Sequence, residues 1–308
     1  MVNLRFAQST ETLLITDMFD RICILGPGLL GASIAMAAKR KNLTASVSTW
    51  SRRQETRDKC LQQHWCDRVD DSPEAAVAGA DLIIICTPVS TIAPLLKTIA
   101  GAIEPNALIT DVGSTKGLIC QDAAAINLPN GCFIGSHPMA GSDQTGMENA
   151  RADLFENAVC FTTPMTDCDA EAHQQLRDFW QALGMRVHST DAFEHDAIVA
   201  AVSHLPHLLA STLCNHLAET HPAWGQFSGT GLRDSTRIAA GDPTLWRDIF
   251  LQNGPAVLAS LDAFETSLKQ ARQAIEQADG ERLFALLEKG QRFRNQLANG
   301  CERKDGSQ

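Results

Sequence analysis

A histidine followed by a proline, in the stretch GSHPMAG over residues 135–141, is the first candidate for chemistry in this sequence. The intrinsic pKa of histidine is about 6.5, so a neutral imidazole at His137 could accept a proton from a reacting hydroxyl group near neutral pH. An apolar run over 131–135 predicts a strand directly before it, which would bring His137 to the ligand-binding edge of a sheet. On the residues alone, His137 is either such a base or a loop residue that fills space.

The absence of tyrosine narrows the choice of proton acceptor. It excludes dehydrogenases that use a Tyr/Lys pair, yet oxidation of an alcohol still requires a group that takes the hydroxyl proton as hydride leaves. None of the other eight histidines follows a predicted strand of the first domain as His137 does: they are His64, His173, His188, His195, His204, His207, His216 and His221.

A second candidate stretch is VSHLPH, over residues 202–207. Its two histidines, His204 and His207, are three residues apart and would share one face of a helix, which the intervening proline would kink or break. No cysteine or carboxylate nearby completes a ligand set, so we expect no metal. Further on, Arg233 and Arg237 lie in a Gly-, Asp- and Thr-containing stretch that looks like a loop, which suits either a surface role or an anion-binding turn.

A glycine-rich turn predicts a dinucleotide-binding site. The motif GPGLLG follows an apolar run, RICIL, and opens a helix-like stretch of small residues, which is the context that the dinucleotide fingerprint requires. Its glycines would allow the tight turn, the approach of the backbone to the pyrophosphate and the packing of the helix on the sheet. The residues expected at the cofactor are Gly26, Gly28, Leu29, Leu30 and Gly31.

The end of the second predicted strand indicates which cofactor fits. Users of NAD commonly place a carboxylate here against the ribose 2′-hydroxyl, whereas this chain continues from Trp50 with Ser51, Arg52 and Arg53. Two guanidinium groups suit a 2′-phosphate, so we predict NADP, with NAD as the alternative. Thr87 and Pro88, after a further strand, are expected to line the same site.

Apolar runs and helical periodicities predict an α/β Rossmann-like domain followed by an all-α domain. Apolar strands separated by helices in the first half indicate a parallel sheet that helices cover on both faces. From about residue 191 the strands stop, and Asp242-Pro243 is a typical helix start. We expect a leader over 1–17, the dinucleotide-binding domain over 18–190, a helical dimerisation and substrate domain over 191–302, and a tail over 303–308.

Composition excludes several classes of partner. The chain has 308 residues, a net charge of −10 and no Lys/Arg-rich run, which argues against nucleic-acid binding. No apolar run approaches the length that spans a membrane, and the first residues are too acidic for a targeting segment, so we expect a cytoplasmic protein. The ten cysteines are scattered without a CxxC pair, which favours reduced core thiols over disulfides or zinc.

Taken together, the motifs resemble those of the prephenate/arogenate dehydrogenases of tyrosine biosynthesis. The matching stretches occur in the family's order over roughly residues 20–300: GPGLLGAS, TDVGSTKG, GSHPMAG, VSHLPH and DSTRIAAGDPTLW. The resemblance implies a Rossmann-like domain followed by a helical domain that forms a homodimer. It also implies a cyclohexadiene substrate whose C4 loses hydride while the ring carboxylate leaves as CO2.

The resemblance assigns roles to individual residues. It implies that His137 accepts the proton of the substrate 4-hydroxyl and that Ser114 helps to orient the two groups. Arg237 would bind the ring carboxylate, His207 would lie near the three-carbon side chain, and His195 would support the site. A lysine-dependent β-hydroxyacid dehydrogenase or imino-acid reductase is disfavoured, because residues 192–240 contain no lysine.

The residues leave the identity of the substrate open between prephenate and arogenate. His207 slightly favours prephenate, which would give 4-hydroxyphenylpyruvate, whereas a preference for NADP slightly favours arogenate, which would give tyrosine. We take prephenate as the expectation. A non-catalytic regulator that senses NADP is the alternative from a different class, and formation of NADPH with either substrate would exclude it.

Overall fold

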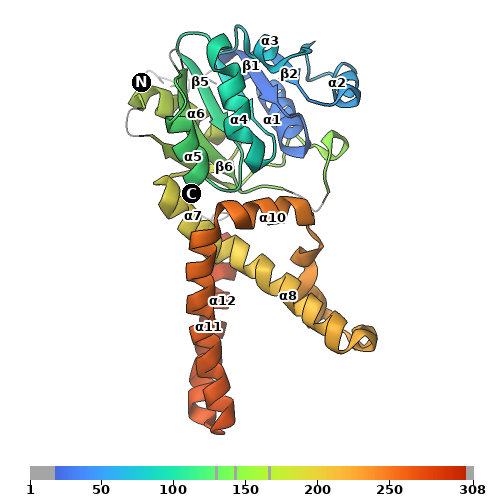
Figure 1. The fold of residues 1–308 in the computed structure, drawn as a ribbon, viewed down its shortest axis with the longest axis vertical. Coiled ribbons are helices and arrows are strands. Elements are labelled where there is room, and N and C mark those ends of the chain that lie inside the picture. The colour runs from blue at the N-terminus through green and yellow to red at the C-terminus, as the bar shows by residue number, and fades with distance from the viewer. Residues whose placement is uncertain (1–17, 129–130, 142–143, 166–167, 303–308) are drawn as a thin grey trace, which may run out of the picture. The chain divides into compact units, whose positions relative to one another are not determined.

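The computed structural model describes residues 18–128, 131–141, 144–165 and 168–302 (Figure 1). Contacts between residues divide the chain into two compact units, one up to Gly254 and one from Pro255 onward. The predicted leader and tail lie outside the described residues, and the domain boundary at 190 stays a prediction.

Eight strands form one sheet in the order β3-β2-β1-β4-β5-β6-β7-β8. Pairing is parallel from β3 through to β6, which confirms a Rossmann-like sheet. The strands are β1 (Phe19–Leu25), β2 (Thr44–Trp50), β3 (Arg68–Val69), β4 (Leu82–Ile85), β5 (Ala107–Asp111), β6 (Gly131–Pro138), β7 (Val159–Pro164) and β8 (Arg186–Ser189).

One pair of strands departs from the predicted parallel sheet. Strand β7 runs antiparallel to β6, with His137 opposite Phe161. A parallel partner would require a crossover, usually a helix, whereas the described part of the β6–β7 connection holds only the short turn η2 (Met147–Asn149). The strand also extends through His137 to Pro138, so this histidine lies within a strand and not in a loop after it.

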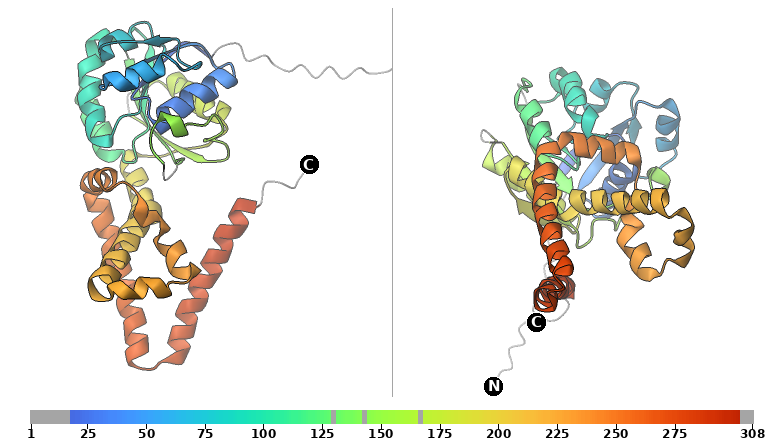
Figure 2. Two further views of the ribbon diagram at one scale, coloured as in Figure 1. Left: turned by 90° about the vertical axis from the view of Figure 1, so that its right-hand side faces the viewer. Right: turned by 60° about the horizontal axis from the view of Figure 1, so that its bottom comes forward.

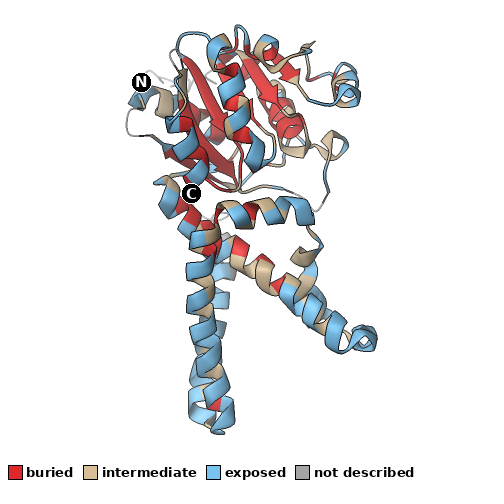
Figure 3. Cartoon of the chain, in the orientation of Figure 1, coloured by how far each residue is buried: buried red, intermediate tan, exposed pale blue. Residues whose placement is uncertain are grey.

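Helices cover both faces of the sheet and create two apolar cores. Along β1 the side chains alternate, so that Ile22 and Ile24 belong to one core and Cys23 and Leu25 to the other. The central strands β4 and β5 are therefore buried along their whole length (Figure 3), whereas the edge strands β3 and β8 are partly exposed. The covering helices are α1 (Leu29–Arg40), α2 (Gln54–Cys60), α3 (Pro73–Val77), α4 (Val89–Ile99), α5 (Gly117–Ala124) and α6 (Ala170–Ala182).

The rest of the first unit is helical. Its elements are α7 (Ala192–Val199), a π-helical turn η3 (Ala200–His204), α8 (Leu205–Thr220), η4 (Pro222–Phe227), α9 (Thr230–Thr236), η5 (Arg237–Ala240) and α10 (Pro243–Gln252). The expected start of α10 is confirmed, since the Asp242 carboxylate accepts hydrogen bonds from the amides of Thr244 and Leu245. The loop-like segment predicted around Arg237 is instead helical, and Thr236 donates to the carbonyl of Leu232 one turn back.

The second unit consists of α11 (Gly254–Glu276) and α12 (Gly280–Glu302), whose ribbons form an open V in the left view of Figure 2. Both helices expose large apolar side chains: Leu258, Leu268, Ile275, Phe284, Leu287 and Phe293. Exposed apolar surface of this extent is typical of an association face.

One helical stretch, Ala192–Thr220, is long and apolar enough to cross a membrane by length and composition. It also carries the buried polar side chains of His195, Asp196, His204 and His207. Ionisable groups inside a membrane are costly, whereas here His195, Asp196 and His204 are hydrogen-bonded to other residues of the protein.

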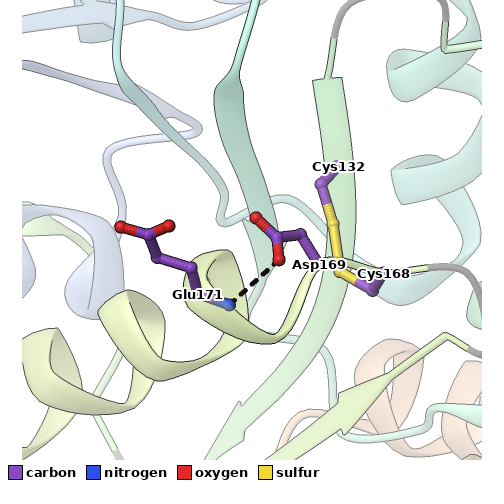
Figure 4. Close-up of a disulfide and its surroundings, with 4 residues drawn as sticks. All are labelled: Cys132, Cys168, Asp169 and Glu171. Atoms are coloured by element: carbon purple, nitrogen blue, oxygen red, sulfur yellow. Dashed lines mark hydrogen bonds between the residues drawn. A yellow bond between two sulfur atoms is a disulfide. The ribbon is translucent and has the colours of Figure 1, made fainter.

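The expectation that all cysteines are reduced is wrong at one pair. Cys132, near the start of β6, forms a disulfide with Cys168 (Figure 4). Cys168 directly precedes the N-cap residue of α6, and the two Cα atoms are 6.2 Å apart. The sequence separation of 36 residues hid this proximity, which arises because β6 and the start of α6 meet in the fold.

Candidate active site

A pocket of about 810 Å³ opens where the dinucleotide was expected, at the carboxyl ends of β1, β2 and β4. Of the predicted cofactor residues it is lined by Gly26, Gly28, Ser51, Arg52, Arg53, Thr87 and Pro88. Leu29 and Leu30 begin α1 beside it, and Gly31 is buried beneath. The hydroxyl of Thr87 is buried without a hydrogen-bond partner among the described residues, which suits a polar group of a bound molecule.

The three glycines of the motif have different surroundings, and these fit a dinucleotide. Gly26 has a φ of +93°, and a Cβ there would lie 2.8 Å from Thr87. A Cβ on Gly31 would lie 2.8 Å from the carbonyl oxygen of Gly26, so the helix could not approach the strand. A Cβ on Gly28 would meet no protein atom within 4 Å, so the space in front of it is open to a pyrophosphate.

The loop that carries the two predicted arginines is held by a third, Arg57, from α2. Its guanidinium donates to the carbonyl oxygen of Ser51 at 2.7 Å and more weakly to that of Arg52 at 3.4 Å. The side chains of Arg52 and Arg53 are exposed at the pocket. Sequence reasoning missed Arg57 because it did not predict helix α2. The spacing of four residues between Arg53 and Arg57, about one helical turn, is the sequence feature that could have revealed this contact.

His137 belongs to a buried chain of three side chains. It is 8% exposed, and its Nδ1 lies 2.9 Å from Nε2 of His195. Nδ1 of His195 lies 2.9 Å from the carboxylate of Asp196. Strand β6 supplies the first member and helix α7 the other two, so the fold brings together residues 58 positions apart.

Asp196, which sequence reasoning missed, determines which ring nitrogens donate and which accept in these hydrogen bonds. Its carboxylate also accepts hydrogen bonds from the backbone amides of Lys116 and Gly117, at 2.7 and 2.8 Å. A carboxylate only accepts, so His195 donates from Nδ1 and presents a lone pair at Nε2. His137 then donates from Nδ1 to His195, and its own Nε2 is left with a lone pair, as a base requires.

Burial keeps both histidines neutral. Burial lowers the pKa of His137 well below the ordinary histidine value, and both the repulsion that a protonated His195 would exert and the positive charge of Lys116 act in the same sense. The pKa of His195 is also lowered by burial, although the hydrogen bond to Asp196 opposes this shift. His137 is therefore unprotonated at neutral pH.

A buried ion pair supports the strand end beneath His137. Lys116 and Asp111 are both fully buried, and the lysine ammonium contacts the aspartate carboxylate directly. The same carboxylate accepts a hydrogen bond from the amide of Ser136 at 3.1 Å, and Trp180 donates to the Ser136 hydroxyl at 3.0 Å. These bonds fix the backbone immediately before His137.

A second group of rings lies on α8 and α10. His207 is 4% exposed and stacks on Trp246 with ring centroids 3.5 Å apart. Burial lowers the pKa of His207, and its Nδ1 has no hydrogen-bond partner among the described residues. Trp246 was not singled out from the sequence, although it ends the motif DSTRIAAGDPTLW.

Two further predicted residues belong neither to the chain of histidines nor to the pair of His207 and Trp246. Ser114 is half-buried between β5 and α5, and in the described part of the protein no hydrogen bond joins it to His137. Arg237 begins η5 and has an exposed side chain. Their roles at the substrate stay predictions.

The fold and this site define a dehydrogenase that uses a nicotinamide dinucleotide. Residues 34–189 match the family model described as the nucleotide-binding domain of prephenate dehydrogenase, and residues 191–289 match its dimerisation domain. The chain belongs to the prephenate dehydrogenase family.

Individual relatives agree with this assignment. The chain is 34% identical over 281 residues to a cyclohexadienyl dehydrogenase of Zymomonas mobilis, covering 90% of this chain and 96% of that protein. A prephenate dehydrogenase from A. aeolicus, solved with hydroxyphenyl propionate and NAD+, superposes with a TM-score of 0.85 at 28% identity, over 90% of this chain and 98% of that one. For the Synechocystis arogenate dehydrogenase the TM-score is 0.80 at 29% identity, over 90% and 99% of the two chains.

Proposed function

We propose that this protein oxidises prephenate to 4-hydroxyphenylpyruvate and CO2 with NADP as the oxidant, in tyrosine biosynthesis. The observation that carries the proposal is the chain Asp196–His195–His137, which ends in an unprotonated nitrogen at the same sheet edge as the dinucleotide pocket. The family descriptions and the A. aeolicus relative support prephenate as the substrate.

In this mechanism His137 acts as the general base. Gly26, Gly28 and Thr87 would hold the dinucleotide in its pocket, and the cofactor would supply the hydride acceptor for C4 of the substrate. Nε2 of His137 takes the proton of the 4-hydroxyl, while His195 and Asp196 hold the ring in the tautomer that can do so. Arg237 places the ring carboxylate and Ser114 orients the hydroxyl. Loss of the carboxylate as CO2 makes the ring aromatic and leaves a phenolate oxygen, to which His137 returns the proton. Most of the rate enhancement comes from placement and proton removal.

Comparison of kcat/KM for prephenate and for arogenate with NADP tests the substrate. We expect the higher value with prephenate, and a higher value with arogenate would overturn this part of the proposal. Arogenate is the second candidate because the Synechocystis relative is an arogenate dehydrogenase of similar fold and identity. A homodimer through residues 191–289 and a cytoplasmic location are part of the same proposal.

Arg52 and Arg53 are expected to set the cofactor preference. The variants Arg52→Ala and Arg53→Ala should each lower kcat/KM for NADP about tenfold or more, because a hydrogen bond to a charged group contributes about 1.5–3 kcal/mol. NAD lacks the 2′-phosphate and serves as the internal control, since its kcat/KM should change little. Wild-type kcat/KM that is higher with NAD than with NADP would contradict the assignment.

Arg237 is expected to act in binding rather than in the chemical step. Arg237→Gln should raise KM for prephenate about tenfold or more with a small change in kcat, as loss of a contact made equally in ground and transition states does. Arg233→Gln, an exposed arginine of the neighbouring α9, is the matched control and should leave KM unchanged. An unaltered KM in Arg237→Gln would remove this residue from the site.

The pH dependence should follow from the lowered pKa of His137. The neutral base is lost only as pH falls through that lowered pKa, so kcat/KM should still be constant at the ordinary histidine pKa of about 6.5 and decline only at lower pH. A pH profile of kcat/KM checks this. An acid limb centred above pH 7 would show that another group controls the reaction.

A further inference from the structure

Two side chains at the end of helix α10, those of Gln252 and the C-cap residue Asn253, form hydrogen bonds to other segments of the first unit. The hydroxyl of Thr115 donates to Oε1 of Gln252 at 2.8 Å. Nδ2 of Asn253, the next residue, donates to the backbone carbonyl of Asp196 at 2.9 Å and lies 3.1 Å from Nδ1 of His204. Asn253 is 3% exposed, so water does not compete for these bonds.

The chemistry of an amide fixes the proton on His204. A backbone carbonyl only accepts, so the atom of Asn253 that faces Asp196 is the NH2 group. That group has two protons, and the second is directed to Nδ1 of His204, which must therefore accept. The proton of neutral His204 is then on Nε2.

We propose that Asn253 is a positioning residue of the dehydrogenase site: its amide holds the backbone of Asp196 and fixes His204 as a neutral imidazole protonated on Nε2. His204 thereby joins two parts of the site. Its ring meets Trp246 edge-on at 6.0 Å and 84°, and Trp246 stacks on His207. Only the kinetic consequence of this inference rests on the proposed function.

The surroundings of His204 explain why a neutral ring matters. Burial lowers its pKa to about 4, while the ionisable side chains that face it are Asp196, which acts in the opposite sense, and His195 and His207, which act in the same sense. A charged His204 would oppose the protonation of His137, and repulsion between the two rings is among the causes that lower the pKa of His137. Because Asn253 donates to Nδ1 of His204, it offers that nitrogen no acceptor that would stabilise a positively charged ring.

Nitrogen NMR of the full-length protein labelled with ¹⁵N-histidine tests the tautomer without any substrate. We expect His204 to show a protonated Nε2 and an unprotonated Nδ1 from pH 8 down to about pH 5, the pH range in which a pKa near 4 leaves the ring neutral. Assignment uses the loss of one signal in His204→Gln. A wild-type His204 protonated on Nδ1, or charged at neutral pH, overturns the inference whatever the variants do.

A matched pair of variants tests the kinetic role. Asn253→Asp and Gln252→Glu make the same change from amide to carboxylate at adjacent residues, but only Asn253 donates to Asp196 and His204, whereas Gln252 accepts. In Asn253→Asp we expect His204 to be protonated on Nδ1 or charged, kcat to fall about tenfold, and a new ionisation in its pH profile. Gln252→Glu should retain the wild-type tautomer and profile.

The two proposals fail separately. If Asn253→Asp folds with the wild-type His204 signals and wild-type kcat, the positioning role is overturned. If the wild-type protein shows the expected His204 tautomer but oxidises neither prephenate nor arogenate, the proposed function fails and the assignment of the tautomer stands.

Discussion

Replacing His137 with asparagine is expected to lower kcat about 100-fold or more while changing KM for prephenate little. Asparagine keeps a polar group of similar reach but has no nitrogen that can accept a proton, and general-base catalysis typically contributes ~10²–10⁴-fold. The acid limb of the pH profile should disappear with the base. Steady-state kinetics with NADP and prephenate measure both effects.

The control for this change is His64→Asn, which makes the same substitution at an exposed histidine that belongs to neither ring group. Its kcat should equal that of the wild type. A His137→Asn variant that folds normally and retains near-wild-type kcat would show that His137 is not the base.

Replacing Asp196 with asparagine is expected to be nearly as damaging, although Asp196 need not touch the substrate. An amide NH2 facing His195 would make Nδ1 of that ring an acceptor and move its proton to Nε2. His137 would then have to accept at Nδ1 and carry its proton on Nε2, where the base should be. We expect kcat to fall about 100-fold with KM nearly unchanged, as measured by the same assay.

Asp191→Asn separates this effect from a change in helix stability. Asp191 caps the same helix and accepts hydrogen bonds from the amides of Phe193 and Glu194, and asparagine caps helices about equally well. Its kcat should remain at the wild-type level. Equal losses of kcat in both variants would mean that Asp196 acts only through the stability of α7.

The sequence predicts the Rossmann-like sheet because continuous apolar strands and a glycine turn are local signals. It predicts the start of α10 for the same reason, since Asp242 and Pro243 adjoin the helix that they begin. Features that depend on contacts between residues far apart in the sequence cannot be predicted from such local signals. The antiparallel β6–β7 pair and the Cys132–Cys168 disulfide both join residues that are far apart in the sequence.

The candidate site shows the same division. His137 is singled out by its place after an apolar run, and Gly28 by its spacing. Asp196 resembles any helical carboxylate in the sequence, and only the approach of α7 to the start of α5 turns it toward the amides of Lys116 and Gly117. The backbone amides that bind Asp196 are 79 and 80 positions away, so no local periodicity or motif in the sequence reveals its role.

The most direct test of the account is the near-ultraviolet absorbance of reduced cofactor after the purified protein is mixed with NADP and prephenate. The account predicts NADPH formed in equal amount with CO2 and 4-hydroxyphenylpyruvate, at a rate that falls about 100-fold in His137→Asn. No reduced cofactor with either prephenate or arogenate, from folded wild-type protein, would contradict it.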